Sequence, residues 1–192
     1  MKKALYINCL MRPDSRTQEL SVAFFEALKG YEVEVLELAK ADLKPLANDF
    51  FFTRQKLLEN GKLDHPRFRY AHQFQQADLI VIAAPFWDLS FPALLKIYIE
   101  NVSVDGITVE AVAEGLQGRC RAEKLIYLTT RGGFYDNSPL EMALPQLEAW
   151  CRFFNISDFQ YVAVDGMNVW GYDSNSALAK GKEKARSLAS SL

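Results

Sequence analysis

A chain of 192 residues, 49% of them hydrophobic, is long enough to form a buried core, and we expect one domain over residues 1–192. The formal net charge is −2 and the basic residues are scattered, so the sequence argues against nucleic acid as a partner. No segment approaches the roughly 18 consecutive apolar residues that cross a bilayer, so we expect no membrane insertion.

The cysteines and histidines give no reason to expect a metal site. Cys9, Cys120 and Cys151 are far apart, odd in number and without the spacing of metal ligands, and only two histidines are present. Unpaired, reduced cysteines are typical of cytoplasmic proteins, and we expect this chain to be cytoplasmic.

The N-terminal segment has the pattern of a strand, a helix and a second strand. Residues 3–10 are apolar and strand-like, and Ser15 is the expected cap of a helix that ends at Gly30. Residues 31–38 alternate apolar and acidic side chains, which predicts a half-exposed strand near an edge of the sheet. This order favours a right-handed parallel crossover.

The segment from 41 to 64 is less regular. We expect a short helix over residues 53–60, stopped by Gly61, and another helix over 66–76. The segment is long for a plain connection, so a flap, a subunit contact and a helical cover for one sheet face all remain open.

The most informative stretch begins with an apolar run, residues 79–84, that is typical of a parallel strand buried on both faces. A bulky aromatic loop follows at 85–89. Ser90 is the expected N-cap of a helix over 93–102, with Pro92 in its first turn. Ligands of open α/β sheets bind beyond the carboxyl ends of the strands, so the aromatic loop suits a flat ring ligand.

The C-terminal half completes an alternating pattern of strands and helices. We expect a small hairpin around residues 107–109, strands over 124–130 and 159–164, and helices over 140–154 and 175–188. Five strands alternating with helices predict an α/β fold, a doubly wound sheet of five parallel strands with helices on both faces.

The loops after the first, third and fourth strands should meet at one edge of this sheet. The first loop contains neither a dinucleotide fingerprint nor a Walker A motif. It does place the hydroxyls of Ser15 and Thr17 and the cations of Arg12 and Arg16 at a helix N-terminus, which would hold a phosphate well. An ordinary capped helix with solvated arginines explains the same residues.

Five short motifs occur in the order and at the spacing of one known family. They are Ser15-Arg16-Thr17, Pro85-Phe86-Trp87-Asp88-Leu89, Pro92-Ala93-Leu94-Leu95-Lys96, Glu114-Gly115-Leu116 and Thr130-Arg131-Gly132-Gly133. With these motifs the chain resembles the flavodoxin-like NAD(P)H:quinone reductases and FMN-dependent NADH azoreductases from Lys3 to about Gly171. The resemblance implies a flavodoxin-like FMN enzyme, usually a homodimer.

The resemblance also implies positions for the cofactor. Ser15, Arg16 and Thr17 would bind the phosphate, with Cys9 beside them. The isoalloxazine ring would be lined by Pro85, Phe86, Trp87, Asp88 and Leu89, and its pyrimidine side would be closed by Thr130, Arg131, Gly132 and Gly133. Asparagine is usual in the family where this chain has Asp88, and azoreductases have Ser-Gln-Ser at 15–17, so the role of Asp88 stays open.

The catalytic positions are implied in the same way. NAD(P)H, the co-substrate, would pass a hydride to the flavin and leave, and a small-molecule acceptor such as a quinone or azo compound would then take two electrons, which is a ping-pong mechanism. N–H groups of Gly132 and Gly133 would stabilise the negative charge of the reduced ring. Tyr135 would hydrogen-bond a carbonyl of the flavin ring or donate a proton. A tyrosine that only stacks on a ring or lies at the surface explains the residue equally well.

Two other functions remain open on the sequence alone. One is a flavodoxin-type electron carrier that binds FMN without nicotinamide activity, although flavodoxins usually have a strongly acidic surface. The other is a flavin-free regulatory or interaction protein on the same fold, since a fold does not fix a function.

Overall fold

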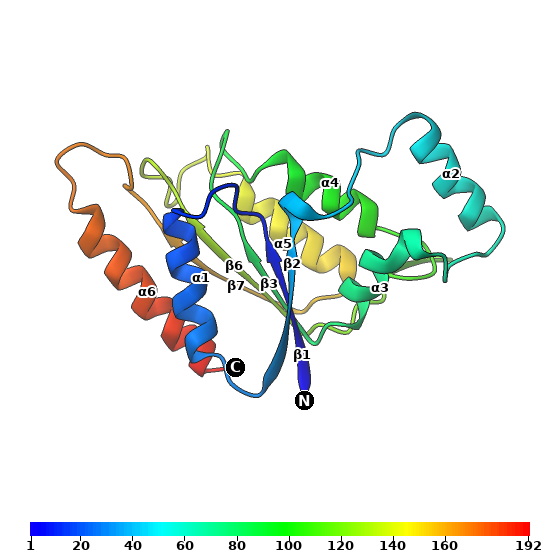
Figure 1. Cartoon of the computed structure of the whole chain (residues 1–192), viewed down its shortest axis with the longest axis horizontal. Coiled ribbons are helices and arrows are strands. Elements are labelled where there is room, and N and C mark those ends of the chain that lie inside the picture. The colour runs from blue at the N-terminus through cyan, green and yellow to red at the C-terminus, as the bar shows by residue number, and fades with distance from the viewer.

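The computed structural model describes residues 1–192 and is built around one parallel sheet (Figure 1). The order of the strands is β2-β1-β3-β6-β7, and every neighbouring pair is parallel. The strands span β1 (Lys2–Asn8), β2 (Tyr31–Glu37), β3 (Leu79–Ala83), β6 (Lys124–Thr130) and β7 (Asp158–Val164). The predicted sheet of five parallel strands is therefore confirmed, with the half-exposed β2 at one edge.

Helices cover both faces of the sheet, as predicted (Figure 1). Helices α1 (Arg16–Ala27) and α6 (Ser174–Ser190) lie on one face, and α3 (Arg69–Gln76), α4 (Ala93–Val102) and α5 (Ala143–Phe154) lie on the other. All of β3 is buried because it is central and covered twice. Each face has its own hydrophobic core, so the sheet is fixed between two packed layers.

The remaining elements are small or peripheral. A short 3₁₀ helix, η1 (Leu38–Lys40), follows β2, and another, η2 (Pro66–Phe68), directly precedes α3. Strands β4 (Val109–Val112) and β5 (Gly115–Gly118) form an antiparallel hairpin, two residues later than the sequence predicted. None of the helices combines the length and apolar character needed to span a bilayer.

Helix α2 (Asn48–Glu59) begins five residues before the predicted start and includes the three phenylalanines at 50–52. It has no buried residue and projects away from the sheet (Figure 1). Only Leu57 and Leu58, near its C-terminal end, pack against the core, so hydrophobic periodicity could not locate its first turn. Its end before Gly61, which has φ of +63°, is as predicted.

The prediction that Ser90 caps α4 is wrong. Helix α4 starts after Pro92, whose fixed φ suits the entry to a helix. Ser90 instead closes a tight turn with Trp87, in which the two backbones exchange N–H···O bonds of 2.8 and 2.9 Å. The turn is part of the candidate site described below.

The packing of α6 on the sheet gives a prediction for Gly181. A Cβ at this buried position would lie 2.3 Å from Val164 Cγ2 and 3.2 Å from Leu20 Cδ2. Alanine favours a helix over glycine by about 1 kcal/mol, but overpacking of a core costs roughly 1–3 kcal/mol. We expect Gly181→Ala to lower the free energy of unfolding in urea, whereas Ser187→Ala on the exposed side of the same helix should not. A Gly181→Ala variant as stable as the wild type would contradict this packing.

Candidate functional site

Four strand exits meet around one cavity of about 530 Å³, a volume within the range of small-molecule sites. The predicted convergence of the loops after β1, β3 and β6 is present, and the loop after β7 joins them. The lining residues are Met11, Arg12, Ser15 and Arg16 after β1, residues 85–89 after β3, Thr130, Gly132 and Tyr135 after β6, and Met167 and Asn168 after β7.

One end of the cavity is the start of α1. Ser15 occupies the N-cap position in an extended conformation, but its side chain makes no capping hydrogen bond. The N–H groups of Arg16 and Thr17 have no backbone acceptor, as expected in the first turn of a helix. A free hydroxyl and free N–H groups at the positive end of a helix form a site for an anion.

Arg16 joins this end of the cavity to the loop after β7. Its Nη1 donates to the carbonyl oxygen of Met167 at 2.5 Å and to Asn168 Oδ1 at 3.2 Å. The guanidinium is thereby held at the rim, where its charge favours the same anion as the helix N-terminus. Met167 and Asn168 were missed by the sequence analysis, because a polar loop after a strand has no periodicity that marks it.

Three predicted residues have side chains outside the cavity. Thr17 is fully buried, and its Oγ1 lies 2.7 Å from Thr130 Oγ1, so it joins α1 to the end of β6. Cys9 is also fully buried, and burial raises the pKa of its thiol to about 12. Arg131 is 2% exposed and points away from the cavity toward Glu141 and Asp165. Gly133 does not line the cavity either.

The turn after β3 forms the opposite wall. Asp88 and Leu89 both have positive φ, 48° and 68°, in the two central positions of the turn closed by Trp87 and Ser90. Two-residue turns of this kind favour Asn, Asp or Gly because other side chains are strained there. Leu89 therefore stores roughly 1–2 kcal/mol of backbone strain, which is a common feature of functional loops.

Aromatic side chains extend this wall. The Trp87 ring is half exposed, and the rings of Phe86 and Tyr135 pack with their centroids 4.7 Å apart. The carbonyl of Leu89 accepts a 3.0 Å hydrogen bond from Met142 N–H, which fixes the turn against the segment before α5. A planar apolar group would find both a flat surface and a rigid one here.

The turn after β6 supplies further free donors. The N–H groups of Gly132 and Gly133 have no backbone acceptor, while their carbonyls accept 2.9 Å bonds from Asn168 and Gly166. A Cβ at Gly132 would lie 3.0 Å from Asn168 Nδ2, and one at Gly133 would lie 3.2 Å from the Tyr135 ring. Gly132 therefore lets the β6 and β7 loops approach each other closely, and Gly133 leaves room for the Tyr135 ring of its own turn.

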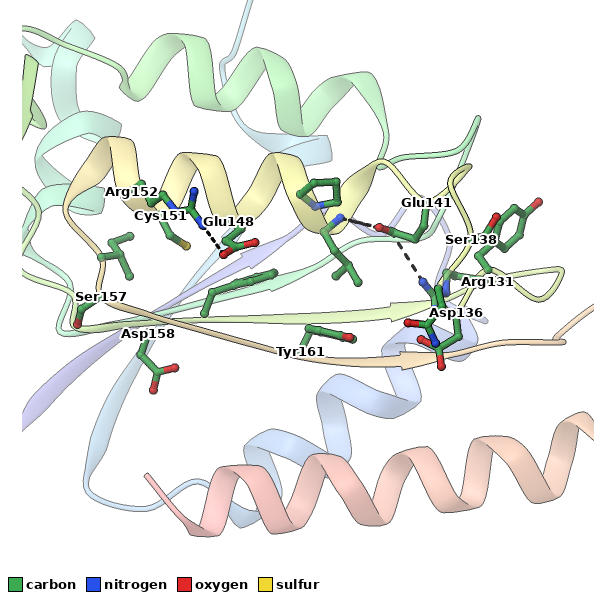
Figure 2. Close-up of a pocket in the computed structure, with 16 residues that line it drawn as sticks. Arg131, Asp136, Ser138, Glu141, Glu148, Cys151, Arg152, Ser157, Asp158 and Tyr161 are labelled. Atoms are coloured by element: carbon green, nitrogen blue, oxygen red, sulfur yellow. Dashed lines mark hydrogen bonds and ion pairs between the residues drawn. The ribbon is translucent and has the colours of Figure 1, made fainter.

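A larger cavity, about 680 Å³, lies between α5 and the edge strand β7 (Figure 2). Its charged side chains are largely paired with each other, for example Arg152 with Glu148 at 2.7 Å. Tyr135 lines both cavities. The smaller cavity is the better candidate, because it alone combines a helix N-terminus with two strand-exit turns. No group of three or more His, Cys, Asp or Glu side chains in the chain is arranged to hold a metal ion.

Comparison with known proteins agrees with this geometry. Residues 2–189 match a protein family described as having a flavodoxin-like fold. The FMN-dependent NADH:quinone oxidoreductase 2 of Clostridium perfringens (strain 13 / Type A) is 39% identical, and the match covers 98% of both chains. The chain belongs to this flavodoxin-like oxidoreductase family. A second relative, FMN-dependent NADH:quinone oxidoreductase 2 of Clostridium acetobutylicum, is 36% identical over 98% of both chains.

Solved structures also match the chain over its full length. The crystal structure of an azoreductase from Bacillus anthracis str. Sterne superposes with a TM-score of 0.84, is 26% identical and covers all of both chains. The family resemblance inferred from the five motifs is confirmed. Within this family fold, the cavity lies at the carboxyl edge of the sheet, where the strand order reverses between β1 and β3.

Proposed function

We propose that this chain is an FMN-dependent NAD(P)H oxidoreductase that reduces quinones, azo compounds or related small acceptors. The observation that carries the proposal is one cavity with free backbone donors at two places, the start of α1 and the turn after β6, and an aromatic turn between them. The two relatives named above are FMN-dependent NADH:quinone oxidoreductases, and this chain matches each of them over 98% of its length, which supports the same conclusion.

The residues present fit FMN in charge and in shape. The phosphate would bind at the N-terminus of α1, where Ser15 Oγ and the N–H groups of Arg16 and Thr17 are free and Arg16 supplies a positive charge. The ring would lie against the turn 85–89, and the N–H group of Gly132 would meet its polar edge. The side chains of three predicted residues would then not contact the cofactor but would pack behind the residues that line the cavity. These residues are Cys9, Thr17 and Arg131.

Bound FMN supplies the redox chemistry, accepting a hydride from NAD(P)H and passing two electrons to the acceptor. The protein binds and orients its partners. Of the two glycines only Gly132 lines the cavity, and its N–H group would stabilise negative charge at the edge of the ring, while Tyr135 would hold a proton or hydrogen bond nearby. Because NAD(P)H and the electron acceptor would share this one cavity, they would bind in turn, which gives ping-pong kinetics.

We further propose a homodimer. Large apolar side chains are exposed near the cavity and on α2, with Trp170 99% exposed, Phe52 67% and Phe134 58%. Exposed apolar side chains at these two places are candidate contacts between two copies of the chain. A solution mass equal to one chain of 21.8 kDa would contradict the dimer. The three buried, unpaired cysteines support a reducing compartment, so we propose a cytoplasmic location, which cell fractionation would test.

The proposed activity separates from its two rivals in one anaerobic experiment. The full chain is mixed with FMN, freed of excess flavin, and then given NADH or NADPH without oxygen. We expect a yellow complex that loses its visible absorbance within seconds and regains it when a quinone is added. A complex that stays yellow with both nucleotides would favour an electron carrier, and a chain that takes up no FMN would favour a flavin-free protein.

Ser15 gives a test of the phosphate end. Ser15→Ala removes a hydrogen bond to a charged group, worth about 1.5–3 kcal/mol, so we expect FMN affinity to fall roughly 10- to 100-fold. Affinity for riboflavin, which has no phosphate, should change little. Fluorescence titration measures both, and Ser176→Ala in the first turn of α6 is the matched control. Equal losses for the two flavins would place the phosphate elsewhere.

Tyr135 gives a test of the ring end. Tyr135→Phe keeps the ring that packs on Phe86 but removes the hydroxyl, so FMN affinity should stay the same. We expect the turnover number with NADH and a quinone to fall by about tenfold or more, as is usual when a general acid is removed. Tyr161→Phe, an exposed tyrosine of β7, is the control. Unchanged turnover would remove the Tyr135 hydroxyl from the mechanism.

A further inference from the structure

A carboxylate outside the cavity holds the turn that carries the free glycine N–H groups. Asp165 follows the last residue of β7, and its side chain is 15% exposed. One oxygen, Oδ1, accepts a short hydrogen bond from Nε of Arg131, whose side chain is 2% exposed. The other, Oδ2, accepts the N–H groups of Tyr135 at 2.7 Å and Asp136 at 2.9 Å.

These bonds join both ends of the turn after β6. Arg131 stands at its start, and Tyr135 and Asp136 stand at its end, so one carboxylate closes the segment 131–136 into a fixed loop. Its middle is held by backbone bonds from the loop after β7, in which Gly166 and Asn168 donate to the carbonyls of Gly133 and Gly132. The carbonyls are thereby occupied and the two glycine N–H groups remain free.

The ion pair also supports the aromatic wall. The guanidinium of Arg131 lies 6.0 Å from the centre of the Phe86 ring, and Phe86 packs on Tyr135. A second carboxylate, Glu141, lies 3.8 Å from Arg131 Nη1 and accepts the N–H of Leu144 at the start of α5 (Figure 2). The network therefore ties the β6 turn to the β7 exit and to α5.

Stability alone is a weak reason for such a network. The desolvation of a buried ion pair often cancels its attraction, and apolar residues of similar volume are frequently as stable or more so. Buried polar groups are instead well suited to fixing one geometry among several. The geometry fixed here is that of Gly132 and Tyr135, the residues assigned above to the polar edge of the ring, and of Gly133 between them.

We propose that Asp165 is a positioning residue of the active site, which fixes the turn 131–136 so that its free N–H groups and the Tyr135 ring are ready for the flavin. This role rests on the proposed function. It assigns to Asp165 no contact with flavin or substrate, because Asp165 does not line the cavity. The residue acts through the turn that it closes.

Asp165→Asn tests the role, because asparagine has the same shape and keeps one acceptor oxygen but loses the charge. The control is Asp158→Asn, which removes the ion pair of Lys124 and Asp158 at the other end of β7. In the chain without flavin, exchange of the hydrogen-bonded amides in 131–136, those of Arg131, Tyr135 and Asp136, should speed up at least tenfold in Asp165→Asn and not in Asp158→Asn. Exchange over residues 15–20 should stay at the wild-type rate.

Flavin binding gives the second readout. Asp165→Asn should weaken FMN and riboflavin equally, by about tenfold, and shift the visible absorption bands of bound flavin, because the ring edge and not the phosphate is affected. General destabilisation would instead speed exchange everywhere and lower the urea midpoint. Wild-type exchange in 131–136, or wild-type affinity for both flavins, overturns the positioning role. A wild-type chain that binds neither flavin overturns the proposed function as well.

A second variant, at Arg131, tests whether the effects of Asp165→Asn come from the loss of the ion pair rather than from the new asparagine. Arg131→Gln removes the other side chain of the pair and should loosen the same segment and weaken both flavins. Because the two side chains act as one unit, the double variant should be no weaker than the weaker single variant. Losses that add in the double variant would show that Arg131 and Asp165 act independently, and would contradict the proposal.

Discussion

The parallel alignment of β1, β3, β6 and β7 is the constraint on which the candidate site depends. Parallel strands end at the same edge, so four loops that are far apart in the sequence share one cavity. Each loop contributes something that the others lack. The first supplies a helix N-terminus, the second an aromatic wall, and the third free N–H groups, while the fourth holds the first and third in place.

Free backbone donors are informative where several of them gather on one cavity. In this chain they are clustered at the start of α1 and in the β6 turn, on the same cavity. The strained turn at Asp88 and Leu89 lies between them. The three features together favour a ligand with a phosphate and a flat ring with a polar edge.

The sequence was sufficient for the fold and for the three loops that line the candidate cavity, because buried strands and the motifs that follow them are local signals. It was not sufficient for the direction of individual side chains. Thr17 and Arg131 lie where the sequence predicts, but their side chains turn away from the cavity. Thr17 contacts Thr130, which is 113 residues away, and Arg131 contacts Asp165, which is 34 residues away. Ser90 looked like a helix cap, yet a local turn with Trp87 uses its backbone instead.

Other parts could not be predicted from local patterns at all. Helix α2 has no fully buried residue to mark its start, and the contributions of Asp165, Met167 and Asn168 depend on the neighbouring β6 turn. Their roles appear only when β6 and β7 are placed side by side. Sequence reasoning therefore found residues that line the cavity more readily than those that hold the lining in place.

The most direct test of the central claim is a backbone amide NMR titration of the flavin-free chain with FMN. We expect the largest shift changes at the N–H groups of Arg16, Thr17 and Gly132, with smaller changes through 85–89. Changes confined to the cavity between α5 and β7, or no saturable change anywhere, would contradict it.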